Sequence, residues 1–258
     1  MYLSYLLIDT GGNPDRPRPG RNWLNNIYNV HRRISMAFPS ADAKENDPHN
    51  IQPFNNQNVK ERDFLFRIDH NVNEDSKRTV IIVQSGIEPD WDYCFHNARD
   101  FLLAPPETKI YIPDFAEGSS ARFRTLINLS VKSSKYRVSD FDGVETGRQG
   151  KRIAFTWDSE TSPEDAVSIW FRDKTKNSGF TIDDIELKRL NWVYGSKMNL
   201  KADPADNPKF HKMKYRAALL DGTLTVTDKQ LFENTIKTGI GSAKSMGFGL
   251  LSAIPISD

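Results

Sequence analysis

The 258-residue sequence has a single cysteine, Cys94, and no long hydrophobic run. One cysteine excludes an intramolecular disulfide and a zinc site built on several cysteines, and a reducing, cytoplasmic setting is the simplest interpretation. No apolar run approaches the ~18 residues that a membrane-spanning helix needs. The apolar residues 1–8 lack a preceding basic segment and a small-residue cleavage pattern, so they predict a first strand rather than a signal peptide.

Several motifs of hydrolases and metalloenzymes are also missing. The five histidines form no H-x-x-x-H or H-E-x-x-H motif, and no clustered carboxylate pattern accompanies them. These absences argue against a metal site. No G-x-S-x-G is present, which weakens a serine-hydrolase interpretation. We therefore expect neither a metal nor a cofactor.

What the sequence does contain is an ordinary folded composition with unevenly distributed charge. It is 38% hydrophobic, and its length suits one large domain or two small ones. The net charge is only +1, but the charges are segregated along the chain. Residues 16–33 hold five arginines and no acidic residue, and residues 188–216 hold 8 basic and 2 acidic residues. Residues 34–115, in contrast, hold 8 basic and 14 acidic residues. Segregated basic blocks suit a polyanion. The alternative is a pair of solvated surfaces on a near-neutral protein.

Periodicity predicts the elements of the first half. A helix is expected over residues 23–38, where one apolar face recurs with helical period at Trp23, Ile27, Val30, Ile34 and Phe38. The prolines in residues 13–21 predict a loop, and the polar, asparagine-rich residues 41–62 predict a loop or disordered insertion. Strands are expected at 1–8, 64–70 and 78–85, with a turn at 88–91 and a closing strand within 100–113.

The second half repeats this pattern. Ser162-Pro163 followed by two acids predicts a helix start, and that helix should run to about Asn177. Strands are expected at 122–131, 181–194 and 212–226, the last divided by a hairpin turn at Asp221-Gly222. A helix capped by Asp228 and a final apolar segment at 249–256 follow. Two β-α-β-β-type units predict an α+β chain of two tandem ferredoxin-like (RRM-like) domains, residues 1–116 and 117–258, each an antiparallel sheet with helices on one face.

The strongest chemical motif is the glycine-rich segment at residues 239–249. It holds four glycines and one lysine, Lys244, between a helix and an apolar strand. It is not a P-loop, because Ala243 precedes the lysine, and it follows a helix rather than a strand, unlike a dinucleotide fingerprint. Free backbone N–H groups and one cation suit a phosphate backbone. The alternative is a packing turn in which glycines allow close approach.

A second motif places Tyr28 and His31 on one helix face, followed by Arg32 and Arg33. A histidine beside two arginines could donate or accept a proton next to a phosphate. The alternative is an ordinary boundary histidine.

These two motifs, at opposite ends of the chain, resemble the RAMP superfamily of CRISPR-associated proteins and, within it, the CasE (Cse3) family of repeat-processing endoribonucleases of type I-E systems. The start MYLSYLLID, Tyr28-x-x-His31 followed by Ala37-Phe38-Pro39, and the terminal GIGSAKSMGFGLLS carry the resemblance. It implies two ferredoxin-like domains and metal-independent cleavage of CRISPR precursor RNA at the base of the repeat hairpin. The products would carry a 2′,3′-cyclic phosphate and a 5′-hydroxyl.

The resemblance also assigns roles and partners. His31 would be the general acid or base, Tyr28 would orient the attacking hydroxyl or the phosphate, and Lys244 or Lys214 would steady the transition state. The chain would stay bound to its crRNA within the type I-E Cascade complex, beside backbone and large subunits, with no membrane involved. RNA contacts are expected from Arg32, Arg33, Arg122, Arg124, Lys212, Arg216, Gly239, Gly241, Ser242, Lys244, Gly247 and Gly249. Two alternatives remain: a non-catalytic RAMP subunit that binds crRNA, and an unrelated two-domain binding protein.

Overall fold

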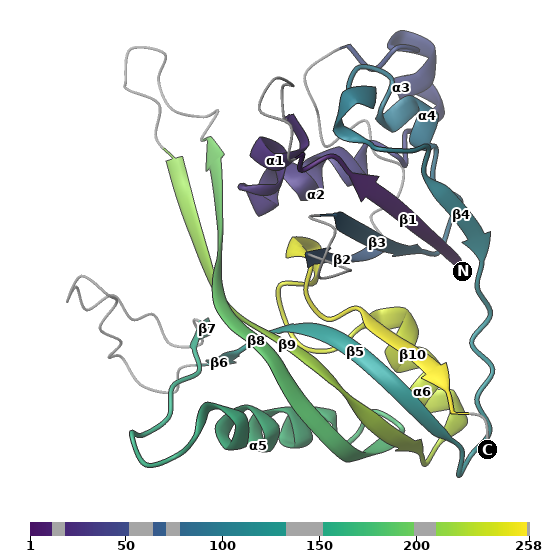
Figure 1. The fold of residues 1–258 in the computed structure, drawn as a ribbon. Helices are drawn as coiled ribbons and strands as arrows, with labels where there is room; N and C mark the ends of the chain where they lie inside the picture. The colour runs from purple at the N-terminus through teal and green to yellow at the C-terminus, as the bar shows by residue number, and fades with distance from the viewer. Residues whose placement is uncertain (12–18, 52–63, 71–77, 133–151, 199–209, 257–258) are drawn as a thin grey trace.

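The computed structural model describes residues 1–11, 19–51, 64–70, 78–132, 152–198 and 210–256. It contains two four-stranded antiparallel sheets, one from each half of the chain (Figure 1). No helix among these residues is long and apolar enough to cross a membrane.

The N-terminal sheet has the strand order β2-β3-β1-β4. Its strands are β1 (Tyr2–Ile8), β2 (Phe64–His70), β3 (Thr79–Ser85) and β4 (Glu107–Ile110). Its helices are α1 (Pro19–Leu24), α2 (Ile27–Ser35), α3 (Ala41–Asn46) and α4 (Trp91–Cys94), with a 3-10 turn η2 (Arg99–Phe101). On β1, Leu6 and Ile8 are buried and join the core beneath α1 and α2, so the helices cover one face.

The C-terminal sheet has the order β10-β5-β9-β8. Its strands are β5 (Ser120–Asn128), β8 (Phe180–Met198), β9 (Phe210–Val226) and β10 (Leu251–Pro255); its helices are α5 (Pro163–Thr175) and α6 (Lys229–Thr238). A 3-10 turn, η3 (Lys244–Met246), precedes β10, and β6 (Ser130–Lys132) pairs with β7 (Arg152–Ala154). In both sheets the unit's first and third strands are central and its second and fourth are at the edges. This confirms the tandem ferredoxin-like fold; the predicted boundary at 116/117 stays a prediction.

Polar contacts from β2 and β3 tie the two halves together. Arg67 on β2 is 2% exposed, and its Nη1 donates to the carbonyl oxygens of Arg124 (3.0 Å) and Leu250 (3.4 Å) and to the Ser252 hydroxyl (2.9 Å). Gln84 Nε2 on β3 donates to the Ile236 carbonyl at the end of α6 (2.8 Å). The open faces of the two sheets thus meet, leaving a cleft of about 660 Å³ between them.

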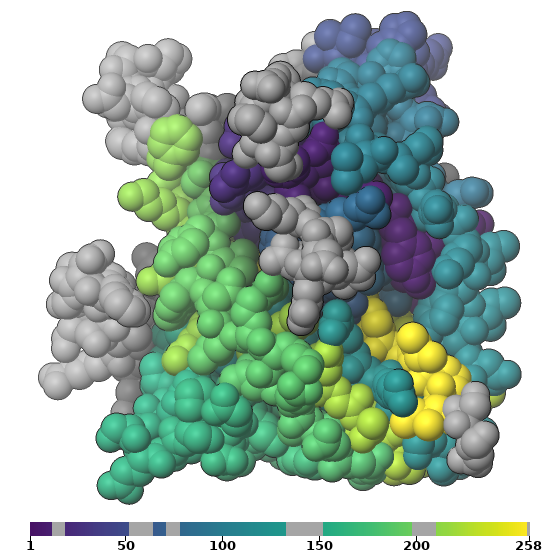
Figure 2. Space-filling model, viewed as in Figure 1, coloured from purple at the N-terminus to yellow at the C-terminus, as the bar shows by residue number. Residues whose placement is uncertain are grey.

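Paired strands β8 and β9 extend beyond the C-terminal sheet and rise beside the N-terminal half (Figure 1). We call residues 190–198 and 210–218 of these strands the ribbon. In the space-filling view its green surface lies beside the purple and teal N-terminal half (Figure 2). Val193 and Tyr215, which face each other across the ribbon, pack against the N-terminal core. Because side chains alternate along a strand, residues 192, 194, 214 and 216 lie on the opposite, outer face.

Three predictions about the first half were wrong. The helix expected over 23–38 is two helices, because Asn26 leaves helical geometry and its side chain caps α2. Pro19 begins α1, so residues 19–21 of the loop predicted over 13–21 are helical, since a proline is tolerated in the first turn; residues 13–18 of that predicted loop lie outside the described residues. Residues 41–46 of the loop or insertion expected over 41–62 form α3, whose Ser40 cap accepts from Ala43 N (3.1 Å); residues 52–62 lie outside the described residues.

The predicted hairpin at Asp221-Gly222 was also wrong, because β9 runs straight through it. Gly222 lies opposite Phe123 on β5, and a Cβ there would approach the Phe123 ring to 2.8 Å and the Asp184 carbonyl oxygen to 2.2 Å. Asp221 accepts two hydrogen bonds from the Arg124 guanidinium at 2.7 and 2.6 Å. Asp221 and Gly222 are therefore strand residues whose contacts fit β9 against β5 and β8.

Candidate active site

The helix that carries Tyr28 and His31 is fixed at its N-terminus by Asn26. The Asn26 Oδ1 accepts from Tyr28 N (3.1 Å), which caps α2, and also from Ser196 N on β8 (3.0 Å). Its Nδ2 donates to the Ser196 carbonyl (3.0 Å) and hydroxyl (3.1 Å). Gly195 leaves room for this contact, since a Cβ there would lie 3.0 Å from Ile27. The N-terminus of α2 is therefore seated on the ribbon.

His31 and Tyr28 are half-buried at the edge of the buried face of α2. The His31 ring stacks on Phe64, at the start of β2, with 5.6 Å between centroids and 22° between planes. Tyr28 lies beside the ribbon, where Lys197 Nζ sits 5.6 Å from the centre of its ring. The predicted pair thus lies where β2 and the ribbon converge on α2.

The glycine-rich segment reaches the same place from the C-terminal half. Its 3-10 turn, η3, contacts both α2 and β2. Met246 packs against the N-terminal core and also against the small cluster of Leu126, Ala217 and Phe248. The structure therefore brings together the two motifs that the sequence carries at opposite ends.

Close packing explains three of the four glycines in the segment. Gly247 has φ +81° and lies under Phe66, whose ring would be 2.9 Å from an added Cβ. The Gly249 carbonyl accepts from Ile240 N (2.8 Å), and the Gly249 N–H donates to the Leu126 carbonyl (2.7 Å). A Cβ added at Gly239 would lie only 2.7 Å from the Gly249 carbonyl oxygen. Around Gly241 an added Cβ meets nothing within 4 Å. The segment is a packed turn with one open glycine.

Lys244 and Ser242 belong to this turn. Lys244 is half-buried, and desolvation lowers the pKa of its ammonium. Within the described residues no carboxylate forms an ion pair with it. The Ser242 hydroxyl is bonded to the Ser130 hydroxyl (2.8 Å) and accepts from Asn128 (3.2 Å), so it anchors the turn to the end of β5. A partly desolvated cation next to a histidine-bearing helix is suited to an anionic ligand.

The other predicted basic residues of the C-terminal half lie elsewhere. Lys214 and Arg216 are on the outer face of the ribbon with Trp192 and Tyr194, across the ribbon from α2. Lys212 is exposed on the same face, opposite Ser196. This placement separates Lys214 from the helix of His31 and leaves Lys244 as the better candidate for the transition-state cation.

The remaining arginines divide between structural contacts and the surface. Arg33 Nη1 donates to the Cys94 carbonyl (2.9 Å) and Asn97 Oδ1 (2.7 Å), which directs it toward α4. Arg124 is paired with Asp221, which raises the pKa of its guanidinium. Arg122 is exposed in the cleft between the sheets, and Arg32 is half-buried on α2. Arg122 and Arg124 thus line the same cleft, whereas Arg33 is directed away from it toward α4.

Sequence reasoning missed Asn26 and Lys197. Asn26 stands inside a stretch that reads as one continuous helix, so its capping role was hidden. Lys197 belongs to the basic block 188–216, but its position over Tyr28 depends on how β8 docks against α2. The sequence shows that Lys197 is charged, but it does not show that Tyr28 is its neighbour in the folded protein.

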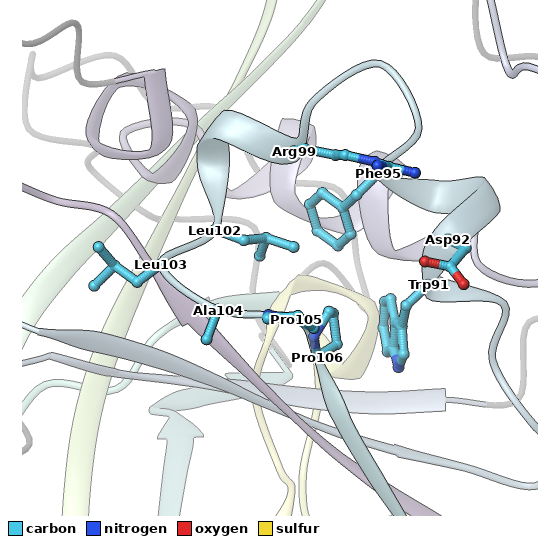
Figure 3. Close-up of a pocket in the computed structure, with 9 residues that line it drawn as sticks. All are labelled: Trp91, Asp92, Phe95, Arg99, Leu102, Leu103, Ala104, Pro105 and Pro106. Atoms are coloured by element: carbon cyan, nitrogen blue, oxygen red, sulfur yellow. The ribbon is translucent and has the colours of Figure 1, made fainter.

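A separate pocket of about 320 Å³ lies on the N-terminal half (Figure 3). Trp91, Phe95, Leu102 and Pro106 form its apolar part, and Asp92 and Arg99 lie at its rim. It contains none of the predicted site residues. Across the described stretches of the chain, no three His, Cys, Asp or Glu side chains come together in a group that could hold a metal ion.

The fold and the paired motifs define a tandem ferredoxin-like protein with a glycine-rich turn packed against a Tyr-x-x-His helix. The family model described as "CRISPR associated protein" matches residues 1–255. The chain therefore belongs to this family of CRISPR-associated proteins, as the sequence motifs indicated.

Individual relatives match over nearly the full length. The CRISPR-associated endoribonuclease Cse3 of Thermus thermophilus is 25% identical, and the match covers 99% of this chain and all of the relative. A solved structure of a CRISPR endoribonuclease Cse3 bound to a 19-nucleotide RNA has a TM-score of 0.66 at 22% identity, covering 99% and 100% of the two chains. A chain of a CRISPR RNA-guided surveillance complex has a TM-score of 0.52 at 18% identity, with the same coverage.

Proposed function

We propose that this chain is a metal-independent endoribonuclease that cleaves CRISPR precursor RNA at the base of the repeat hairpin. Family membership supports this proposal, as does full-length similarity to a relative named as a CRISPR-associated endoribonuclease. The observation that carries it is the contact between α2, which bears Tyr28 and His31, and η3, which begins at Lys244. Each half of the molecule supplies one part of the site.

The chemistry requires only what these residues offer. The ribose 2′-hydroxyl loses its proton and attacks the adjacent phosphorus, and the 5′-oxygen leaves and takes up a proton. The products are a 2′,3′-cyclic phosphate and a 5′-hydroxyl. His31 transfers a proton, since an imidazole changes charge near neutral pH. Lys244 and the N–H groups of the turn stabilise the negative charge that develops on the phosphate oxygens.

Tyr28 orients the reacting groups. A phenolic hydroxyl is a good hydrogen-bond donor, which suits it to hold a hydroxyl or phosphate oxygen in place. Lys197 lies over its ring, with Nζ 5.6 Å from the ring centre, and brings a second cation to α2. We assign Lys197 to phosphate contact near Tyr28, in addition to the residues that the sequence predicted.

The product remains bound, and the chain joins an interference complex in the cytoplasm. A chain of the same fold occurs in the surveillance complex, which supports this assembly. Basic residues of the block 188–216, Lys212 among them, hold the stem of the hairpin through its backbone, because A-form RNA is recognised mainly by shape and phosphate contacts.

A cleavage assay tests the nuclease directly. Wild type, His31→Ala and Tyr28→Phe are incubated in EDTA with a repeat hairpin RNA, and the product ends are identified. We expect His31→Ala to lose about 100-fold or more in single-turnover rate. His49→Ala, which removes an exposed histidine of the same half, is the matched control and should cleave normally. Tight binding without cleavage by wild type would instead support a non-catalytic RNA-binding subunit.

A further inference from the structure

The outer face of the ribbon carries a row of alternating aromatic and cationic side chains. We define the cation–aromatic ladder as Trp157, Arg216, Trp192, Lys214 and Tyr194. The Arg216 guanidinium lies 3.9 Å from the centre of the Trp157 ring and 6.0 Å from that of Trp192. The Lys214 ammonium lies 4.2 Å from the Trp192 ring and 5.7 Å from the Tyr194 ring. Each cation thus sits between two rings.

Strand register arranges the ladder in two columns. Trp192 and Tyr194 are on β8, and their cross-strand partners on β9 are Arg216 and Lys214. Residues two apart on a strand are separated by roughly 6.7 Å, about twice the ~3.4 Å rise per nucleotide of a stacked strand. Rings at this spacing match the bases of an extended, unstacked strand and not those of a duplex.

The ladder is exposed at its Tyr194–Lys214 end and is distinct from the candidate active site. Trp192, Arg216 and Trp157 are half-buried, and Arg216 Nη1 donates to the Phe155 carbonyl (2.7 Å). Tyr194 is 55% exposed, and Lys214 is also exposed. Val193 and Tyr215, the intervening cross-strand pair, point the other way and pack against the N-terminal core. The same two strands therefore present one face to the site of Tyr28 and His31 and another to the surroundings.

We propose that the cation–aromatic ladder binds an unpaired segment of the RNA that flanks the hairpin. Bases stack on Trp192 and Tyr194, while Lys214 and Arg216 contact the adjoining phosphates, a combination typical of single-strand binding surfaces. The stem itself would leave the rings unused, because base faces are covered in a duplex. The identity of the RNA rests on the proposed function, and the chemistry of an unpaired polyribonucleotide rests on the ladder.

Binding of a short labelled oligouridine, which forms no hairpin, tests the ladder by fluorescence polarisation. We expect Tyr194→Ala to bind about tenfold more weakly, the size of one lost base–aromatic stack, and Tyr194→Phe to bind like wild type. Tyr93→Ala, which truncates a half-buried tyrosine on α4, is the matched control. Lys214→Met should reduce the salt dependence of binding by about one phosphate contact, whereas Tyr194→Ala should leave that slope unchanged.

Tryptophan fluorescence gives a readout that phosphate contacts alone would not move. Oligouridine should quench the wild-type emission, and Trp192→Phe should abolish most of that quenching. Equal affinities for Tyr194→Ala and Tyr93→Ala, or quenching that persists in Trp192→Phe, would overturn the proposal and leave the ladder as a brace that stiffens the ribbon. Hairpin cleavage is measured separately. If the protein cleaves the hairpin but does not bind oligouridine, only the RNA-binding role of the ladder is disproved. If it binds oligouridine through Tyr194 but does not cleave the hairpin, only the proposed nuclease activity is disproved.

Discussion

Asn26 and Ser196 join the two halves of the molecule through three hydrogen bonds at the N-terminus of α2. The Asn26 amide donates to the Ser196 carbonyl and hydroxyl, and its oxygen accepts from Ser196 N. The same oxygen caps the helix that carries Tyr28 and His31. One side chain therefore sets both the start of α2 and its position against the ribbon.

Replacing Asn26 should lower stability and cleavage together. Asn26→Ala removes a helix cap, which costs about 1 kcal/mol, and leaves Ser196 N unpaired at about another 1 kcal/mol. Displacement of Tyr28 should slow single-turnover cleavage by about 10- to 100-fold. Urea unfolding and a rate measurement on the folded variant check this. Asn29→Ala, on an exposed position of the same helix, should change neither quantity. A stable Asn26→Ala variant that cleaves at the wild-type rate would show that the contact is irrelevant to the site.

Arg67 should be among the most sensitive positions for folding. It makes a bidentate pair with Asp69 at 2.8 and 2.9 Å and bridges to the second half. Arg67→Met leaves the buried Asp69 carboxylate without its partner, and we expect a loss of about 3–5 kcal/mol in the free energy of unfolding. The double variant Arg67→Met/Asp69→Leu should recover part of that loss. A loss below about 1 kcal/mol in the single variant would contradict this account.

Two glycines of the turn provide a matched comparison. Gly247 and Gly241 both have positive φ, at +81° and +79°, but only Gly247 packs under a ring. Gly241→Ala should cost about 1–2 kcal/mol for the left-handed backbone. Gly247→Ala adds a clash with Phe66 and should also reduce cleavage by about tenfold or more, because η3 must shift. Equal rates for Gly241→Ala and Gly247→Ala would argue that the exact seat of η3 is unimportant.

The pH dependence of cleavage should report Lys244. Burial lowers the pKa of this lysine, so its charge is lost at a lower pH than that of an ordinary lysine. The alkaline decline in single-turnover rate should accordingly shift to higher pH in Lys244→Arg, since a guanidinium stays protonated. The folded state binds this proton less tightly than the unfolded state does. The free energy of unfolding should therefore rise as pH increases from the lowered pKa of Lys244 in the folded state to its ordinary pKa in the unfolded state. If the rate declines at the same alkaline pH in Lys244→Arg as in wild type, the decline reports the titration of a group other than Lys244.

Local patterns predicted most of the fold, and tertiary contacts explain the failures. The Ser162 cap, the strand at residues 64–70 and the helix after Asp228 were each visible in short stretches of sequence. The hairpin at Asp221-Gly222 was wrong because glycine there accommodates the Phe123 ring from another strand. A dipeptide does not reveal a ring that packs on it from a distant strand.

The site divides in the same way. Tyr28 and His31 share a short helical motif, and the glycine turn is a compact cluster, so both could be found in the sequence. The position of Lys197 over Tyr28, and the separation of Lys214 from α2, follow from the docking of the ribbon. Lys197 and Lys214 belong to one basic block but lie on opposite faces of the ribbon. A count of charges along the sequence does not reveal this difference.

The most direct test of the account uses the RNA itself as the variant. Wild-type protein is mixed in EDTA with two repeat hairpins that differ only by a 2′-deoxyribose at the scissile position. We predict equal affinity for both and cleavage of the all-ribose RNA alone, leaving a 2′,3′-cyclic phosphate, because the 2′-hydroxyl is the nucleophile. Cleavage of the deoxy-substituted RNA at the same position would contradict the central claim, since water would then have to be the attacking group.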